Sequence, residues 1–169
     1  DRIFPGCRLL DIHEYLMEKG VKAEGATGVR YLYHDPCHSP MKQQDPMKTV
    51  RALVGENVLK SERCCGESGT LGVTRPDIST QVRFRKTEEL RRDEAALREL
   101  MKGAAGGAGA VPEKGPIKIL TSCPSCLQGL HRYTGDLQNG LLEADYVVIE
   151  MASRILGPDW LPDYVERAN

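Results

Sequence analysis

Large aromatic side chains and long apolar stretches are scarce in this chain of 169 residues. It contains two Phe and one Trp, so a core has to be built mainly from Leu, Val, Ile, Ala and Met. No apolar run approaches the roughly 20 residues that a membrane-spanning helix requires. The first residues also lack the charged-then-apolar pattern of a secretory signal peptide. The composition therefore predicts a globular domain without a transmembrane segment.

An excess of charge of either sign is also missing. The chain has 23 Lys and Arg against 24 Asp and Glu, which gives a net charge of −1. Proteins that bind nucleic acid usually carry a clear basic excess, so we expect no nucleic-acid partner. No H-E-x-x-H motif and no convincing Ser/His/Asp arrangement is present. The chemistry of the chain has to be sought in its six cysteines.

The length fits one domain. We expect residues 1–169 to form a single domain that belongs to a larger protein, because the chain opens on Asp1 rather than Met. Residues 103–116 are rich in Gly and Ala and are expected to form a flexible surface loop. This segment follows a helical pattern and has neither a GK[ST] nor a G-x-G-x-x-G pattern, so it is not a phosphate-binding loop.

Strand-like and helical patterns alternate along the chain. Alternation of this kind predicts an α/β fold, with a mainly parallel sheet of about four strands and helices on both faces, similar to a Rossmann fold. We expect strands at residues 29–34, 57–63, 117–121 and 145–149, and helices at residues 7–19, 46–54, 77–101 and 150–156 and from Pro124 onward.

Two of the expected helices lead to predictions about burial. In the first helix, Leu9, Ile12 and Leu16 recur at helical spacing and predict its buried face. Cys7, at the start of this helix, is expected to be a buried small hydrophobic residue rather than a ligand. In the long helix, the basic residues, Lys86 among them, are expected to lie on a solvated face.

Five of the six cysteines follow three of the expected strands. Cys37 comes just after the first strand, Cys64 and Cys65 after the second, and Cys123 and Cys126 after the third. Ligands of parallel sheets bind beyond the carboxyl ends of the strands, so we expect the five thiols to gather at one rim. The vicinal pair and the C-x-x-C spacing favour metal or redox chemistry in a reducing compartment. A cytoplasmic location, including the cytoplasmic face of a membrane, is expected.

This number of thiolates suits an iron–sulfur cluster better than one zinc ion. Zinc takes four ligands in a tetrahedron, and the peptide between Cys64 and Cys65 restricts where both sulfurs can point. In a cluster, neighbouring sulfurs can reach different irons. Two alternatives stay open. One is a structural zinc module, and the other is thiol–disulfide exchange at residues 123–126, which leaves the other three cysteines unexplained.

Three segments resemble, in their order, the motifs of the cysteine-rich CCG domain. They are residues 33–38 (YHDPCH), 64–69 (CCGESG) and 122–126 (SCPSC), and the resemblance covers about residues 29–149. It implies a [4Fe-4S] cluster, noncubane in heterodisulfide reductase, that can be lost or replaced by zinc in an aerobic preparation. The implied ligands are Cys37, Cys64, Cys65, Cys123 and Cys126. From their positions in the sequence, His34, His38 and Gly66 are expected to lie beside the ligands, where the histidines hydrogen-bond a sulfur, relay a proton or shape the turn and the backbone N–H of Gly66 faces the cluster.

The resemblance also implies a redox function. CCG domains occur in a subunit of heterodisulfide reductase, in the iron–sulfur subunit of glycolate oxidase and in FAD-linked oxidases. The implied role is to relay electrons from the flavin of a 2-hydroxy-acid oxidase to a quinone or another acceptor. FAD is then expected on a flavoprotein partner, not on this chain, and a second CCG domain is a further expected partner. Disulfide reduction, as in heterodisulfide reductase, is the alternative, and whether the chain is itself an enzyme stays open.

Overall fold

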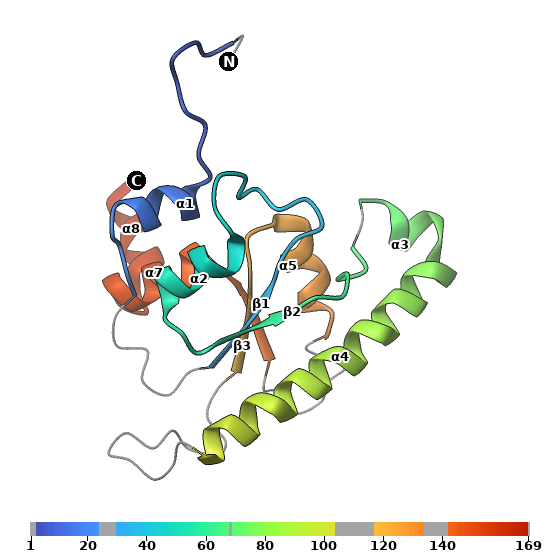
Figure 1. The fold of residues 1–169 in the computed structure, drawn as a ribbon. Helices are drawn as coiled ribbons and strands as arrows, with labels where there is room; N and C mark the ends of the chain where they lie inside the picture. The colour runs from blue at the N-terminus through green and yellow to red at the C-terminus, as the bar shows by residue number, and fades with distance from the viewer. Residues whose placement is uncertain (1–2, 24–29, 68, 104–116, 134–141, 169) are drawn as a thin grey trace.

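A parallel sheet forms the centre of the computed structural model, which describes residues 3–23, 30–67, 69–103, 117–133 and 142–168 (Figure 1). Its four strands lie in the order β2-β1-β3-β4, and every neighbouring pair is parallel. The predicted α/β class is confirmed. The strands are β1 Arg30–His34, β2 Val58–Ser61, β3 Ile117–Thr121 and β4 Leu142–Tyr146.

Helices cover both faces of the sheet. Successive side chains of a strand point to opposite faces, so Tyr31 and Tyr33 of β1 pack in one core cluster and Leu32 packs in the other. The first cluster is closed by α1, α2 and α7, and the second by α4 and α5. The helices are α1 Ile12–Glu18, α2 Pro46–Val54, α3 Leu71–Thr74, α4 Pro76–Gly103, α5 Pro124–His131, α7 Val147–Leu156 and α8 Trp160–Ala168.

The order of the strands places three loops side by side. The chain runs from β1 to β2 on one side and then crosses to β3 on the other side of β1. His34, the last residue of β1, pairs with Ser61 at the end of β2 and with Thr121 at the end of β3. A crevice beyond the carboxyl ends of the strands, at such a reversal of strand order, is the usual ligand site of doubly wound sheets.

The last strand lies earlier in the sequence than predicted. Residues 142–146 form β4, and Val147 begins α7 instead of continuing the strand. The pair Thr121–Tyr146 is the last of the β3–β4 ladder, so a longer β4 would have no partner. Val147 and Met151 lie one helical turn apart and are buried in the core. The run of β-branched residues after Tyr146 therefore packs as a helix face.

The first helix is shorter than predicted. It begins at Ile12 rather than at residue 7, because the side chain of Asp11 caps it in a capping box. Leu9, which precedes this cap, is 71% exposed, and Ile12 is 50% exposed. Of the three residues expected on the buried face, only Leu16 packs against the core.

The ends of the remaining elements agree in part with the sequence predictions. Helix α4 matches the predicted long helix, whereas α8 was not predicted because Pro162 lies within it. Proline is tolerated in the first turn of a helix, and the Trp160 indole N–H donates to Ser153 Oγ of α7 at 3.1 Å.

Of the expected loop at 103–116, only residue 103 lies within the described residues, as the end of α4. Among the described residues, no helix is long and apolar enough to cross a membrane.

A buried carboxylate ties α7 to the sheet. Glu150 of α7 is 1% exposed and accepts hydrogen bonds from the Tyr31 hydroxyl at 2.6 Å, Lys118 Nζ at 2.8 Å and Arg154 Nε at 2.7 Å. Burial alone would raise the pKa of Glu150, but the donors outweigh it and hold this pKa below the usual value.

Glu150→Gln is expected to lower the free energy of unfolding at pH 7 by about 2–4 kcal/mol, because it leaves the half-buried cations of Lys118 and Arg154 without their partner. The folded pKa lies below the unfolded value, so the stabilisation is complete above about pH 4.3 and is lost as the pH falls through the folded pKa. Urea titrations from pH 7 downward should therefore show a flatter pH dependence for the variant. Glu143→Gln, which removes a 69% exposed partner of Lys118, should cost less than about 1 kcal/mol. Equal losses in both variants would contradict the role given to Glu150.

Candidate metal centre

The three loops that leave β1, β2 and β3 carry the five cysteines predicted to gather at one rim. Cys37 follows the end of β1, Cys64 and Cys65 follow β2, and Cys123 and Cys126 follow β3, with one or two residues between each strand end and its first cysteine. All five are free thiols. The sheet therefore brings together residues that are far apart in the sequence.

Four of the thiols form a connected series. The side chain of Cys37 is hydrogen-bonded to Cys64, Cys64 to Cys65, and Cys65 to Cys126. The hydrogen bond with Cys126 and burial raise the pKa of Cys65 to about 11. The hydrogen bond with Cys65 and burial raise the pKa of Cys64, and burial and the neighbouring Cys64 raise that of Cys37. Without a metal, Cys37, Cys64 and Cys65 are therefore protonated, and a cation that binds there has to displace protons.

The fifth cysteine lies at the start of α5. Cys123 is the N-cap residue of this helix, is half-buried and lies near Tyr146. Pro124 follows at the first helical position, and Cys126 lies buried within the first turn. Cys123 packs against the core cluster that contains Cys65 and Cys126, which places it beside the thiol series.

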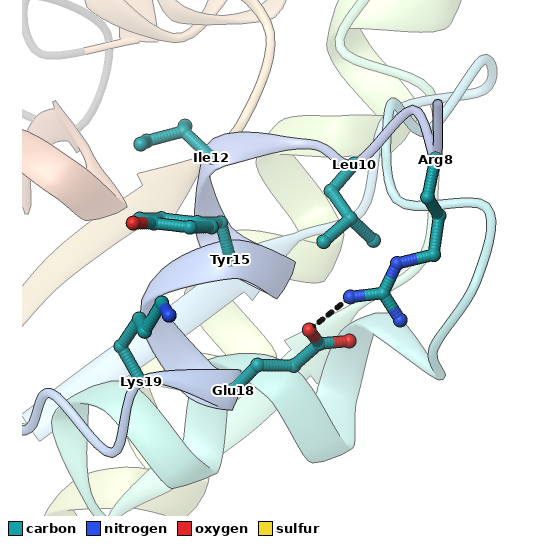
Figure 2. Close-up of a pocket in the computed structure, with 6 residues that line it drawn as sticks. All are labelled: Arg8, Leu10, Ile12, Tyr15, Glu18 and Lys19. Carbon is teal, nitrogen blue, oxygen red and sulfur yellow. Dashed lines mark hydrogen bonds and ion pairs between the residues drawn. The ribbon is translucent and has the colours of Figure 1, made fainter. Parts of the chain in front are cut away.

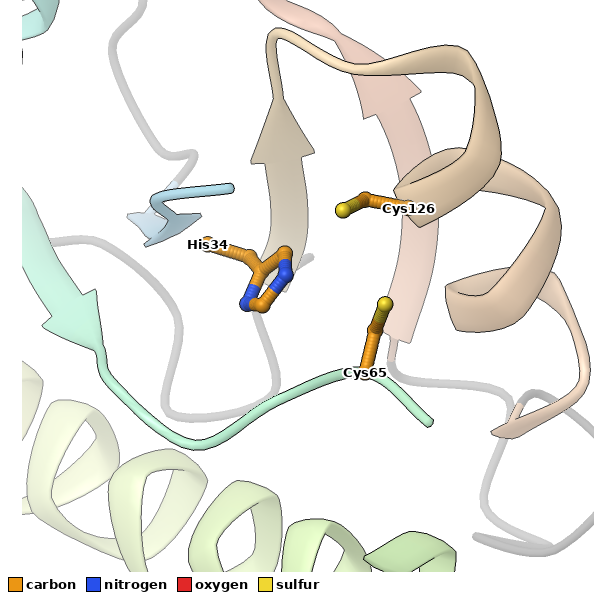
Figure 3. Close-up of side chains that lie close together, drawn as sticks. All are labelled: His34, Cys65 and Cys126. Atoms are coloured by element: carbon orange, nitrogen blue, oxygen red, sulfur yellow. The ribbon is translucent and has the colours of Figure 1, made fainter. Parts of the chain in front are cut away.

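The most enclosed part of the site contains a histidine and two cysteines. His34, Cys65 and Cys126 are 0%, 3% and 6% exposed, and one potential ligand atom from each lies within 4.8 Å of the others. Figure 3 shows the three side chains pointing toward one another from β1, the loop after β2 and α5. His34 Nε2 is buried and makes no hydrogen bond. Such a nitrogen beside two thiols fits a site that is completed by a bound metal or cluster.

The loop that carries the vicinal cysteines depends on a glycine. Gly66 has φ +80°, a left-handed conformation that residues with a side chain rarely adopt. This conformation turns its backbone N–H toward Cys64 Sγ, to which it donates at 3.4 Å. The predicted role of Gly66, that it shapes the site, is consistent with this contact. Hydrogen bonds to sulfur stabilise the thiolate form that metals require.

The same loop rests directly on α5. A Cβ atom at Gly129 of α5 would lie 2.6 Å from Cβ of Glu67 and 3.5 Å from Cβ of Cys65. Only the absence of a side chain at position 129 lets the two segments approach this closely. The Tyr133 hydroxyl donates to the carbonyl of Cys65 at 2.8 Å, and Arg132 forms an ion pair with Glu67 at 2.7 Å. The position of Cys65 is therefore fixed by α5.

A lysine that was expected on a solvated face lies under the site. Lys86 of α4 is fully buried, with its Nζ 2.6 Å from Glu89 Oε2 and 3.5 Å from His34 Nδ1. The prediction was wrong because α4 packs this face against the end of β2. One signal was available, since Lys86 precedes the buried Leu90 by four residues and therefore shares its face.

The charges beneath the rim are paired. Glu89 accepts the backbone N–H groups of Glu62 and Arg63, each at 3.0 Å, and the ammonium of Lys86. Burial would raise the pKa of Glu89, but these donors lower it below the usual value. Burial lowers the pKa of Lys86 against the attraction of Glu89. Burial, followed by the charge of Lys86, lowers the pKa of His34 to about 4, so this imidazole is neutral at pH 7.

Two other predicted residues lie at the surface. His38 is exposed next to Cys37, which is itself exposed. Cys7 is exposed as well, so the prediction that it is buried was wrong. The cause is that α1 starts only at Ile12, which leaves Cys7 outside the helix that was expected to bury it.

Two of the hollows in the surface of the described residues bear on the extent of the site. One of about 440 Å³ is lined by Cys64, Arg63, Val82, Arg85 and Glu88, and it opens the rim to solvent. The other, of about 550 Å³, lies along α1 and contains the ion pair between Arg8 and Glu18 (Figure 2). No cysteine lines the second hollow, so it is separate from the candidate site. The residues that line it are Arg8, Leu10, Ile12, Tyr15, Glu18 and Lys19.

Comparisons with known proteins match most of the chain. The family described as Cysteine-rich domain (CCG) matches residues 31–131, and a domain of unknown function, DUF3400, matches residues 131–169. A subunit of the fumarate reductase (CoM/CoB) of Methanothermobacter marburgensis is 29% identical over 92 residues. This match covers 50% of the present chain and 19% of the relative, so the chain spans about a fifth of that protein. No solved structure matches.

Proposed function

The chain belongs to the family of cysteine-rich CCG domains, and on this premise we propose that it holds a [4Fe-4S] cluster of the noncubane type and serves electron transfer. The observation that carries the proposal is the series of linked thiols at the carboxyl ends of three adjacent strands. When bound, the cluster supplies a redox centre to the domain. The proposed ligands are Cys37, Cys64, Cys65, Cys123 and Cys126.

The thiols and their neighbours suit an iron–sulfur cluster. Five thiols are more than one zinc ion takes, and groups that can donate hydrogen bonds to sulfur lie beside two of them. The Gly66 N–H donates to Cys64 Sγ, and the neutral His34 faces Cys65. Hydrogen bonds of this kind tune the potential of iron–sulfur centres. We propose that His34 and Gly66 surround the cluster in this way, and that the exposed His38 lies at its solvent side.

The proposed reaction partner is a flavoprotein, which holds FAD on a separate domain or subunit. Oxidation of a 2-hydroxy acid to a 2-oxo acid releases two electrons and two protons to the flavin. The domain then relays the electrons to an acceptor such as a quinone, which takes up two protons and becomes a quinol. In this proposal residues 1–169 act as one CCG unit, alone or beside a second CCG domain. Its free thiols favour the cytoplasm, including the cytoplasmic face of a membrane.

Disulfide reduction is the second candidate, and the exposure of the rim favours it. Cys37 is exposed and Cys64 borders the 440 Å³ hollow, so a disulfide can reach the sulfur series from solvent. Reduction of one disulfide consumes two electrons and two protons and yields two thiols. The electrons would have to come from the same kind of flavoprotein partner.

Anaerobic reconstitution with iron and sulfide is expected to give a brown protein with about four iron and four sulfide per chain, as the cluster type requires. Metal and sulfide analysis, absorption and electron paramagnetic resonance spectra measure this result. A colourless protein without iron, or one that binds a single zinc ion and no iron, would overturn the proposal. Reoxidation of the reduced protein by a quinone, without release of thiol from an added alkyl disulfide, supports the relay. Thiol release favours the second candidate.

A further inference from the structure

The buried ammonium of Lys86 has three hydrogen-bond partners. Its Nζ lies 2.6 Å from Glu89 Oε2, 2.5 Å from Ser61 Oγ and 3.5 Å from His34 Nδ1. A lysine ammonium has three N–H donors and no acceptor. The Ser61 hydroxyl donates its own proton to Glu89 at 3.1 Å, so its oxygen is left to accept from Lys86. One N–H of Lys86 is therefore directed at the imidazole of His34.

The charge state of this group follows from its contacts. The carboxylate of Glu89 accepts the backbone N–H groups that follow β2 and the ammonium of Lys86, an arrangement that stabilises both charges. A protonated His34 would place a second cation 3.5 Å from Lys86 in the interior of the protein. Such a pair of like charges is strongly unfavourable. The imidazole is therefore neutral and carries one proton.

The position of that proton decides what His34 can do. Nδ1 accepts from Lys86 and needs its lone pair, so the proton lies on Nε2. Nε2 is the atom of His34 that is buried without a hydrogen-bond partner. It lies on the side of the ring that faces Cys65 and Cys126, as the grouping of the three side chains in Figure 3 shows. A protonated ring nitrogen cannot coordinate a metal, but it can donate to sulfur.

We propose that Lys86 sets the tautomer of His34, so that His34 donates its Nε2–H to the sulfurs of the metal centre and is not itself a metal ligand. Lys86 is then a positioning residue that acts through His34. The role toward a bound cluster rests on the proposed function, whereas the tautomer is a property of the metal-free chain. The charge of Glu89 and a hydrogen bond with the backbone of Ser61 oppose Lys86 by favouring the protonated ring, but burial and the charge of Lys86 outweigh them and lower the pKa of His34.

The tautomer can be measured in the reduced, metal-free protein by two-bond ¹H–¹⁵N NMR. In the unsubstituted chain, Nε2 of His34 is expected at the shift of a protonated nitrogen and Nδ1 at that of an unprotonated one. Lys86→Met should move the proton to Nδ1, at least in part, while Lys48→Met, a change at an exposed lysine of α2, should not. A proton on Nδ1 in the unsubstituted chain overturns the proposal, and so does an Nε2–H signal that Lys86→Met leaves unchanged.

A second measurement uses the iron-loaded protein. The variant His34→Asn also serves the NMR experiment, because the signals that it lacks are those of His34. In the iron-loaded protein, this variant should keep the iron content unchanged, because no ligand is removed. It should lower the reduction potential, because a hydrogen bond to sulfur is lost. Loss of iron in this variant to the level of a cysteine variant would make His34 a ligand and overturn the proposal. The NMR result does not depend on a cluster. A chain that shows the expected tautomer but binds no iron would refute the proposed function and leave the inference about Lys86 standing.

Discussion

Cys65→Ser is expected to lower the iron retained after anaerobic reconstitution by about tenfold or more, because a serine hydroxyl does not replace a thiolate as an iron ligand. Cys65 is the most buried of the five cysteines, with 3% exposure. It is hydrogen-bonded to both Cys64 and Cys126 and thus lies in the middle of the series. Serine is nearly the same size, so the fold should persist. Iron and sulfide analysis after gel filtration measures the loss.

Cys7→Ser is the matched control for this prediction. Cys7 is exposed, precedes α1 and is not part of the thiol series. Its replacement should leave the iron and sulfide content unchanged. Circular dichroism of both variants verifies that the fold is retained. If the Cys65 variant keeps as much iron as the Cys7 variant, Cys65 is not a ligand.

Gly129→Ala is expected to destabilise the protein by about 1–3 kcal/mol, although alanine is the better helix former, because the added methyl group overpacks a buried contact. The new Cβ would lie 2.6 Å from Cβ of Glu67, which is attached to the backbone and cannot rotate away. The loop after β2 then has to move off α5 and carries Cys65 with it. Iron content should fall together with stability, as urea unfolding and metal analysis measure.

Gly72→Ala provides the comparison for Gly129→Ala. A Cβ at Gly72 of α3 would meet Arg132 Nη1 at 3.6 Å and Ser79 Oγ at 3.8 Å, which are ordinary van der Waals distances. This change should alter the free energy of unfolding by less than about 1 kcal/mol, with any gain coming from helix propensity. It should not affect iron binding. Equal behaviour of the two variants would show that the close approach at Gly129 is unimportant.

The sheet and the gathering of the cysteines were predictable because both follow from local patterns and one topological rule. Residues 31–34 and 117–121 have the composition of buried strands, and each is followed by its cysteine motif. Ends of parallel strands lie at the same edge. The boundary at Val147 was missed because β-branched residues favour strands. Only the register with β3 shows that the ladder has already ended at Tyr146.

The groups beneath the rim were missed for a different reason. Charged residues on a long helix usually face solvent, and the spacing of Lys86 to Leu90 does not by itself distinguish a buried cation from an exposed one. The partners that make burial acceptable come from three separate elements: Ser61 from β2, His34 from β1 and Glu89 from α4. No local pattern in the sequence brings these three side chains together. The buried network becomes visible only once α4 has been placed against the sheet.

The strand order also determines when during synthesis the site can exist. β1 and β2 emerge early and carry three of the thiols, but the strand that pairs with the other side of β1 follows only after the 28-residue α4. A nascent chain that stops before Ile117 presents Cys37, Cys64 and Cys65 without the cysteines that complete the series. The complete set of proposed ligands therefore becomes available only after residues up to Cys126 have been synthesised. A metal bound there would link the early part of the chain to the late part. Such a metal would be retained only by a chain in which both parts have folded.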